Sequence, residues 1–183
     1  IISCTKDNNI KQSFGPKKER YDYYENFLSK NVEKRDIEVW LPSGYDKAQS
    51  LPVLYMFDGQ NIYHGIRGWD KKQYNHGWQV DETLDSLFSK GNIPKMIVVG
   101  VHNIGKKRYS EYTPAKPKSL VKKRMSNADI RFREVYDKHD ITSDKFLKFL
   151  VEELKPFIDR NYKTDSGRNS TFLAGSSMGG LIS

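Results

Sequence analysis

The sequence predicts an α/β fold in which a mostly parallel sheet is flanked by helices. Three continuous apolar runs, residues 51–57, 96–101 and 171–174, have the length of strands and lack the polar alternation of a strand with one solvated face. Two segments of helical period, residues 78–89 and 143–160, separate these runs. Covered strands that alternate with helices are typical of parallel sheets.

Two more strands are expected ahead of these runs, over residues 25–31 and 35–41. In the second, Ile37, Val39 and Leu41 stand at every other position, as expected for a half-buried strand. The predicted sheet therefore has at least five strands.

Apolar spacing defines the two predicted helices. Residues 78–89 carry apolar side chains at helical intervals, and Gly91 marks the end of this helix. Residues 143–160 form a second apolar stripe. Ser143 is its predicted N-cap, and Pro156 is expected to bend or end the regular helix.

Length and composition are those of one globular domain. The 183 residues are 37% hydrophobic and 30% charged, and no apolar run approaches the length of a membrane span. Cys4 is the only cysteine, which excludes an internal disulfide and a cysteine-based zinc site. We expect residues 21–183 to form the domain and residues 1–20 to be a flexible tail or tether.

The N-terminus suggests a location. Ile1-Ile2-Ser3-Cys4 resembles the last four positions of a bacterial lipoprotein signal, whose cysteine becomes the lipidated first residue. A polar stretch that suits a tether follows. This resemblance predicts an extracytoplasmic protein anchored to a membrane through Cys4. The alternative is a chance tetrapeptide in a tail, with a cytoplasmic protein.

Positive charge is concentrated in one segment. The net charge is +8, and residues 104–138 hold eleven Lys and Arg against four Asp and Glu. A nucleic-acid binder would spread basic residues along a face among aromatic residues, so no nucleic-acid partner is expected. The segment follows the strand 96–101 and reads as an insertion near the ligand-binding edge of a parallel sheet. Its basic side chains would attract an acidic substrate, or they would belong to a solvated surface insertion; they are Lys106, Lys107, Arg108, Lys116, Lys118, Lys122, Lys123 and Arg124.

The run 171–174 leads directly into Gly175-Ser176-Ser177-Met178-Gly179, a Gly-x-Ser-x-Gly motif. This pattern is typical of a nucleophile elbow, in which a strand delivers a serine to a sharp turn and a helix follows at once. Ser177 is then the nucleophile and the backbone N–H of Met178 an oxyanion donor. Ser176 is the rival nucleophile, but it occupies the second motif position. The alternative is a tight turn that only closes the strand.

Several segments in a fixed order extend this interpretation. Together with the motif they resemble an esterase family of the α/β-hydrolases that includes feruloyl and acetyl-xylan esterases, siderophore esterases and S-formylglutathione hydrolase. The resemblance runs from about Arg35 to the last residue. The segments that carry it are residues 35–46, 51–61, 78–84, 97–101, 108–114 and 157–162.

The resemblance implies acyl transfer to water through Ser177, without a metal or organic cofactor. The position after Asp58-Gly59 matches the family's second oxyanion donor, which selects the N–H of Gln60. The family often has His-Gly where this chain has Asp58-Gly59, and a plain turn after a strand is the alternative there. The candidates for substrate binding are Asp58, Gly59, Trp69, Trp78 and Arg108, although packing is the favoured account of Trp78.

The acid and the base of a catalytic triad are not found. In this fold they follow the serine in the order Asp or Glu, then His. All four histidines precede Ser177, and their spacing predicts no metal site. His102 follows a strand, but a loop role is favoured over that of a base. The sequence thus resembles an esterase truncated after the elbow, lacking roughly another hundred residues. By itself we expect it to be inactive, with an exposed hydrophobic edge beside the elbow strand.

The sequence as a whole predicts a serine carboxylic-ester hydrolase. Its substrate would be a carbohydrate-linked, aromatic or siderophore ester, small or on a polysaccharide. An acyltransferase that uses the same nucleophile is one alternative. A non-catalytic carbohydrate- or siderophore-binding domain with a hydrolase-like fold is the other.

Overall fold

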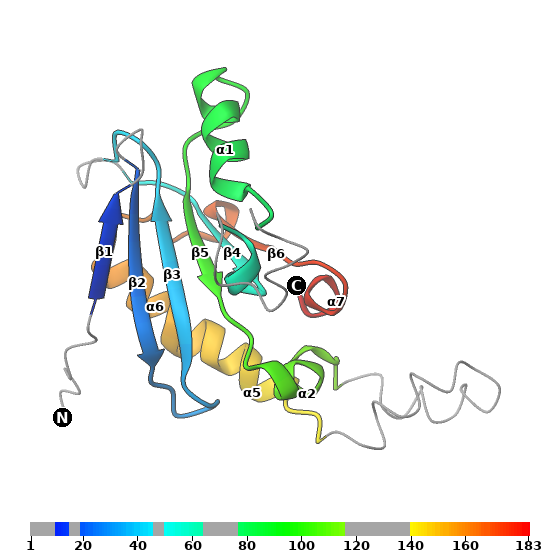
Figure 1. The fold of residues 1–183 in the computed structure, drawn as a ribbon. Coiled ribbons are helices and arrows are strands. Elements are labelled where there is room, and N and C mark those ends of the chain that lie inside the picture. Colours follow the sequence, from blue (N-terminus) through cyan, green and yellow to red (C-terminus); the bar gives the residue numbers. More distant parts are fainter. Residues whose placement is uncertain (1–9, 15–18, 46–49, 64–76, 116–139) are drawn as a thin grey trace.

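A mixed sheet of six strands forms the centre of the fold (Figure 1). The computed structural model describes residues 10–14, 19–45, 50–63, 77–115 and 140–183. The strand order is β1-β2-β3-β5-β4-β6. The strands are β1 (Ile10–Phe14), β2 (Arg20–Phe27), β3 (Arg35–Leu41), β4 (Val53–Phe57), β5 (Ile97–Val101) and β6 (Thr171–Ala174).

The sheet is parallel only in the half formed by β5, β4 and β6. The pairs β1–β2, β2–β3 and β3–β5 are antiparallel. The α/β fold is confirmed, but the sheet is mixed, because β1, β2 and β3 follow one another without helical crossovers. Antiparallel strands need only short connections, whereas parallel neighbours need a crossover.

Two predictions about the N-terminal part differ from the structure. The strand expected over residues 25–31 is β2, which ends at Phe27. The hydroxyl of Ser29 accepts hydrogen bonds from the N–H groups of Asn31 and Val32, and this turn prevents the strand from continuing. Within the expected tail, residues 10–14 form β1, whose side chains are all exposed. Backbone pairing with β2 orders them, so no apolar pattern reveals this strand.

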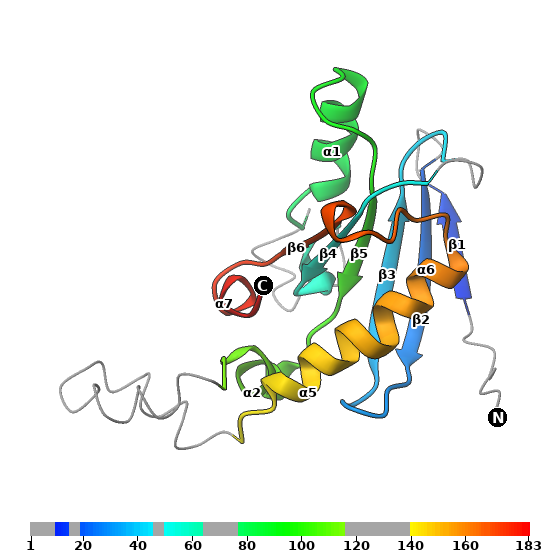
Figure 2. The ribbon, with the colours of Figure 1, turned by 180° about the vertical axis from the view of Figure 1, so that it is seen from behind.

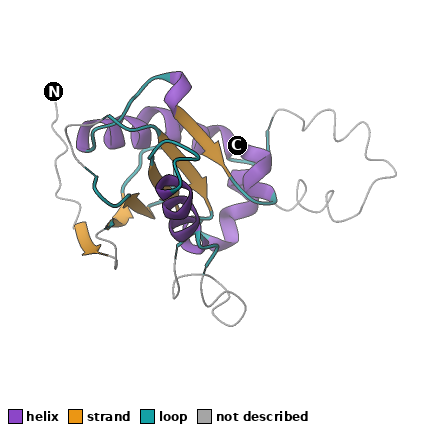
Figure 3. Cartoon of the chain, turned by 90° about the horizontal axis from the view of Figure 1, so that it is seen from above, coloured by secondary structure: helices purple, strands orange, loops and turns teal. Residues whose placement is uncertain are grey.

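Helices cover both faces of the sheet (Figures 2 and 3). One face packs against a long helix built from α5 (Ser143–Lys148), the π-helical segment η3 (Phe149–Leu154) and α6 (Lys155–Asn161). The other face packs against α1 (Val80–Ser89). The strand β4 serves both layers, because Val53, Tyr55 and Phe57 face the long helix while Leu54 and Met56 face α1.

The long helix differs in detail from the sequence prediction. Its N-cap is Thr142, while Ser143 is buried and its hydroxyl accepts a hydrogen bond from the N–H of Ala115. Pro156 does not end the helix, which continues to Asn161. The proline is the second residue of α6 and directly follows the π-helical segment, so the change in hydrogen-bond pattern falls next to the position that lacks a backbone donor.

The shorter helices lie in the connections. They are η1 (Gly59–Asn61) after β4, η2 (Gly105–Lys107) and α2 (Arg108–Tyr112) after β5, η4 (Arg168–Ser170) before β6 and α7 (Met178–Ile182) after β6. No helix in the described ranges is long and apolar enough to cross a membrane.

The outer edge of the sheet is apolar, as the sequence predicts. Phe172 and Leu173 of β6 are 47% and 46% exposed. A groove of about 460 Å³ runs between this strand and the long helix, where Val151 is also exposed. The described structure therefore leaves an open, apolar strand beside the Gly-x-Ser-x-Gly motif.

Candidate active site

Ser177 stands at a sharp turn between β6 and α7. Its backbone angles are φ 56° and ψ −121°, a conformation that a residue with a side chain rarely adopts. Such strain costs on the order of 1–3 kcal/mol and is found mainly at functional sites. Ser177 is also exposed to solvent. Strand, strained serine and immediate helix are the three parts of a nucleophile elbow.

The glycines of the motif allow this turn to close. A Cβ added to Gly175 would lie 2.3 Å from the carbonyl carbon of Gly179 and 2.4 Å from its oxygen. A Cβ added to Gly179 would lie 3.4 Å from the Asp58 carboxylate. The two ends of the motif therefore pack backbone against backbone, and the second end also lies next to the loop that follows β4.

Replacing Gly175 with alanine is expected to lower the free energy of unfolding by about 1–3 kcal/mol, since the Gly179 backbone must move to admit the methyl group. Urea unfolding measures this change. Gly167→Ala is the control, because its added Cβ meets only the Asp165 side chain, at 3.3 Å. Equal stability of the two variants would contradict the tight packing of the elbow.

The two predicted oxyanion donors lie at the same edge of the sheet. The strands β4 and β6 are parallel neighbours, and Met56 is paired with Ala174, so Gln60 and Met178 both follow the carboxyl ends of adjacent strands. Within the described parts of the chain, neither backbone N–H has a hydrogen-bond acceptor.

The loop that carries Gln60 is held against β5. A Cβ added to Gly59 would lie 2.6 Å from the carbonyl carbon of Gly100, so only glycine fits there. The Gln60 side-chain oxygen accepts a hydrogen bond of 3.1 Å from the N–H of Asn103. These contacts direct the Gln60 side chain toward the segment that follows β5, while its backbone N–H has no acceptor in the described part of the chain.

Asp58 and Arg108, both predicted to bind substrate, bind each other. The Nε and Nη2 atoms of Arg108 each lie 2.7 Å from a different oxygen of the Asp58 carboxylate. Asn103 donates a further bond of 2.7 Å to the same carboxylate. Asp58 is only 2% exposed, so its carboxylate is occupied by protein donors. Hydrogen bonding to Asp58 is the main cause that raises the pKa of Arg108.

The remaining predicted residues divide into packed and undescribed ones. Trp78 packs against the core on the α1 side of the sheet. Its backbone N–H donates to the backbone carbonyl oxygen of Asn61 at 2.7 Å. Lys106 and Lys107 follow β5 at the predicted edge of the sheet. The candidates outside the described residues are Cys4, Trp69, Lys116, Lys118, Lys122, Lys123 and Arg124.

No general base is identified for Ser177 among the described residues. His102 is 7% exposed, and its Nε2 lies 3.9 Å from a carboxylate oxygen of Glu38 in β3. The other three histidines fall outside the described residues. Within the described ranges, no group of three His, Cys, Asp or Glu side chains could hold a metal ion.

Sequence reasoning missed the partners that fix α2. Tyr112 accepts a hydrogen bond from the N–H of Asp58 at 3.3 Å. Burial raises the pKa of Tyr112 well above its usual value, so its hydroxyl stays protonated. Glu111 forms a buried ion pair with Arg35. Glu111 and Tyr112 lie in the segment 108–114, which carries part of the family resemblance. The neighbouring sequence does not indicate which distant residues they contact.

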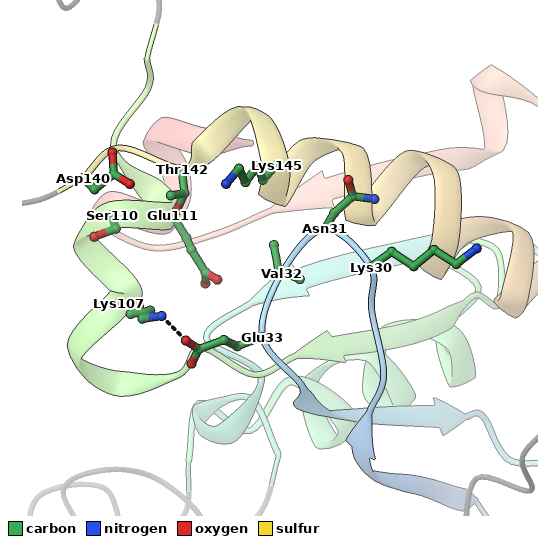
Figure 4. Close-up of a pocket in the computed structure, with 10 residues that line it drawn as sticks. All are labelled: Lys30, Asn31, Val32, Glu33, Lys107, Ser110, Glu111, Asp140, Thr142 and Lys145. Carbon is green, nitrogen blue, oxygen red and sulfur yellow. Dashed lines mark hydrogen bonds and ion pairs between the residues drawn. The ribbon is translucent and has the colours of Figure 1, made fainter.

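A hollow of about 380 Å³ lies on the side of α2 where Glu111 is found (Figure 4). The loop before β3, α2 and the start of α5 form its walls, and Lys107 pairs with Glu33 at its rim. Lys107 is one of the basic residues expected to attract an acidic substrate, but the predicted nucleophile and both predicted oxyanion donors are absent from the lining.

Comparison with known proteins agrees with this geometry. Residues 29–183 match the family described as Putative esterase. An endo-1,4-beta-xylanase/feruloyl esterase of Xylanibacter ruminicola is 26% identical over 172 residues, which cover 85% of this chain and 18% of that protein.

Two solved structures share the fold. An IroE-like serine hydrolase from Shewanella oneidensis superposes with a TM-score of 0.60 at 28% identity, covering 88% of this chain and 44% of that one. A ferulic acid esterase from Anaeromyces mucronatus superposes with a TM-score of 0.51 at 24% identity. The match covers 93% of this chain and 50% of that one. The chain thus spans half or less of each of these proteins. On the family match over most of its length, this chain belongs to the Putative esterase family and has the α/β-hydrolase fold.

Proposed function

We propose that the protein is a carboxylic ester hydrolase that works through an acyl-enzyme on Ser177. The observation that carries the proposal is the strained conformation of this exposed serine between β6 and α7. A turn that merely closes a strand does not need a non-glycine residue at φ 56°. A nucleophile elbow does, because the strain presents the hydroxyl above the sheet.

The reaction would proceed in two steps. The Ser177 hydroxyl attacks the ester carbonyl, its proton passes to a base, and the oxyanion accepts hydrogen bonds from the N–H groups of Gln60 and Met178. Collapse of this intermediate expels the alcohol, which takes the proton, and leaves the acyl-enzyme. Water then repeats the sequence and releases the acid. We infer that the base and its orienting carboxylate come from outside the described residues.

An aromatic acid esterified to a carbohydrate is the substrate that the relatives favour. Feruloyl or ferulic acid esterases appear both among the sequence relatives and among the structural neighbours. A siderophore ester is the second candidate substrate, on the similarity to the IroE-like hydrolase. An acyltransferase would use the same site with an alcohol in place of water, and product analysis with and without added sugar separates the two.

Covalent labelling tests the nucleophile. In an active polypeptide that contains this chain, a fluorophosphonate should form a single adduct, which peptide mass spectrometry places on Ser177. If an aromatic ester is the substrate, methyl ferulate should slow the labelling. If the substrate is an acetylated polysaccharide or a siderophore ester, acetylated xylan or the siderophore ester should slow the labelling instead. An adduct on Ser176 or on another residue would contradict the proposed nucleophile, and no adduct would favour the non-catalytic binding domain.

A further inference from the structure

The Asp58 carboxylate joins the loops that follow β4 and β5 and faces the loop that follows β6. Asp58 itself follows β4, and it is bonded by Asn103 and Arg108, which both come after β5. The Nη2 atom of Arg108 also lies 3.5 Å from the carbonyl oxygen of Ser176 in the elbow. The contact between α2 and α7 fits their neighbouring positions in Figure 1.

A second feature of Asp58 is its backbone conformation. Its backbone is left-handed, at φ 59° and ψ 43°, which is unfavourable for a residue with a side chain. This turn leads the chain from β4 into η1, where the Gln60 N–H is presented. The Asp58 side chain is held by Arg108, and the Asp58 backbone N–H donates to the hydroxyl of Tyr112. The helix α2 thus holds Asp58 by both its side chain and its backbone.

The helix α2 is itself firmly anchored. Three residues after Arg108, Glu111 forms a two-point ion pair with Arg35, with N–O distances of 3.0 and 2.6 Å. The side chains of Arg35 and Glu111 are 0% and 3% exposed. The Arg35 guanidinium also lies 5.2 and 5.1 Å from the ring centres of Phe146 and Phe149. Arg108 therefore extends from a support fixed to the core toward both halves of the site.

We propose that Arg108 is a positioning residue, which acts through Asp58 to hold the loop of Gln60 at a fixed distance from the elbow of Ser177. This inference rests on the proposed esterase function. An oxyanion hole works only if its donors are already in place when charge develops on the carbonyl oxygen. A displacement of about 1 Å costs on the order of 100-fold in rate. Arg108 thus affects the transition state without contacting the substrate.

Steady-state kinetics of Arg108→Gln, in an active polypeptide that contains this chain, tests the proposal. We expect kcat to fall on the order of 100-fold, with KM almost unchanged. The double variant Asp58→Asn/Arg108→Gln should lose no more than the worse single variant, since both residues act through one contact. Arg160→Gln, which changes an exposed arginine at the end of α6, is the matched control and should leave both constants unchanged.

Other outcomes overturn the inference and are distinguishable from one another. A raised KM for acidic esters with unchanged kcat would make Arg108 a substrate-binding residue, as the sequence predicts. Additive losses in the double variant would show that Arg108 does not act through Asp58. If Ser177→Ala retains turnover, the proposed function fails, whatever the Arg108 variants do.

Hydrogen exchange provides a readout that needs no substrate. In the 183-residue chain, Arg108→Gln should speed amide exchange in residues 58–62 and 176–180, while exchange in the long helix stays as in the unchanged protein. The double variant serves if the single one fails to fold, because it leaves no unpaired buried carboxylate. Unchanged exchange in both segments would contradict the positioning role.

Discussion

Replacing Ser177 with alanine is expected to lower kcat for a p-nitrophenyl ester by on the order of 10⁴-fold or more, because the variant cannot form an acyl-enzyme. The free energy of unfolding should not fall, since the removed hydroxyl is exposed and alanine is no less compatible than serine with the strained turn. The measurement is steady-state kinetics in an active polypeptide that contains this chain, together with urea unfolding of the same samples.

Ser176→Ala is the matched control, since it removes a hydroxyl from another exposed serine one residue away. The Ser176 contacts in the structure use its backbone carbonyl, which receives the N–H of Gly179, so the alanine variant should retain most of its activity. A large loss of kcat in the Ser176 variant, with activity preserved in the Ser177 variant, would reverse the assignment of the nucleophile.

Replacing Glu111 with glutamine is expected to lower the free energy of unfolding by about 3–5 kcal/mol. The substitution keeps the shape of the side chain but leaves the buried Arg35 charge without its counter-ion. Among the described residues, the Arg35 Nε has no acceptor and Nη2 otherwise has only the backbone carbonyl oxygen of Glu33, at 3.4 Å, which supplies no negative charge. Denaturant unfolding measures the change in the 183-residue chain.

Glu33→Gln is the control for the removal of a negative charge from an ion pair. Its partner is Lys107, and the two side chains are 58% and 54% exposed, so the expected change is below about 1 kcal/mol. The double variant Arg35→Met/Glu111→Leu should recover part of the stability that Glu111→Gln loses, because it removes both buried charges. Equal, small losses in Glu33→Gln and Glu111→Gln would contradict the anchoring of α2 by the buried pair.

The elements that were predicted well are those with a strong local signal. The strands β4, β5 and β6 lie within one or two residues of the apolar runs that predicted them, and α1 has its expected apolar face. The strand β1 was missed, since its residues are stabilised by pairing with β2 and none of them is buried. A local apolar pattern in the sequence indicates which residues are buried. It gives no signal for a strand that is stabilised only by backbone hydrogen bonds to a distant segment.

The candidate site shows the same division. Gly175, Ser177 and Gly179 lie within five successive residues of one turn, so their spacing in the sequence already predicts the local geometry of that turn. Arg108 and Asp58 are fifty residues apart in sequence, and both carry charges that suit a ligand equally well. The sequence predicts both as substrate-binding residues, and only the structure shows that they form an ion pair with each other.

The sequence by itself determined the parallel half of the sheet, the sharp turn at Ser177 and the family to which the chain belongs. These follow from periodic burial and from a turn whose backbone admits few residues, which are local properties. Only the tertiary structure decided that the sheet is mixed, that Asp58 is buried and that α2 connects the loop of Gln60 to the elbow. The physical reason is that a charged side chain pairs with whichever opposite charge folding brings close to it. The order of residues along the chain does not specify the distance between two residues far apart in sequence.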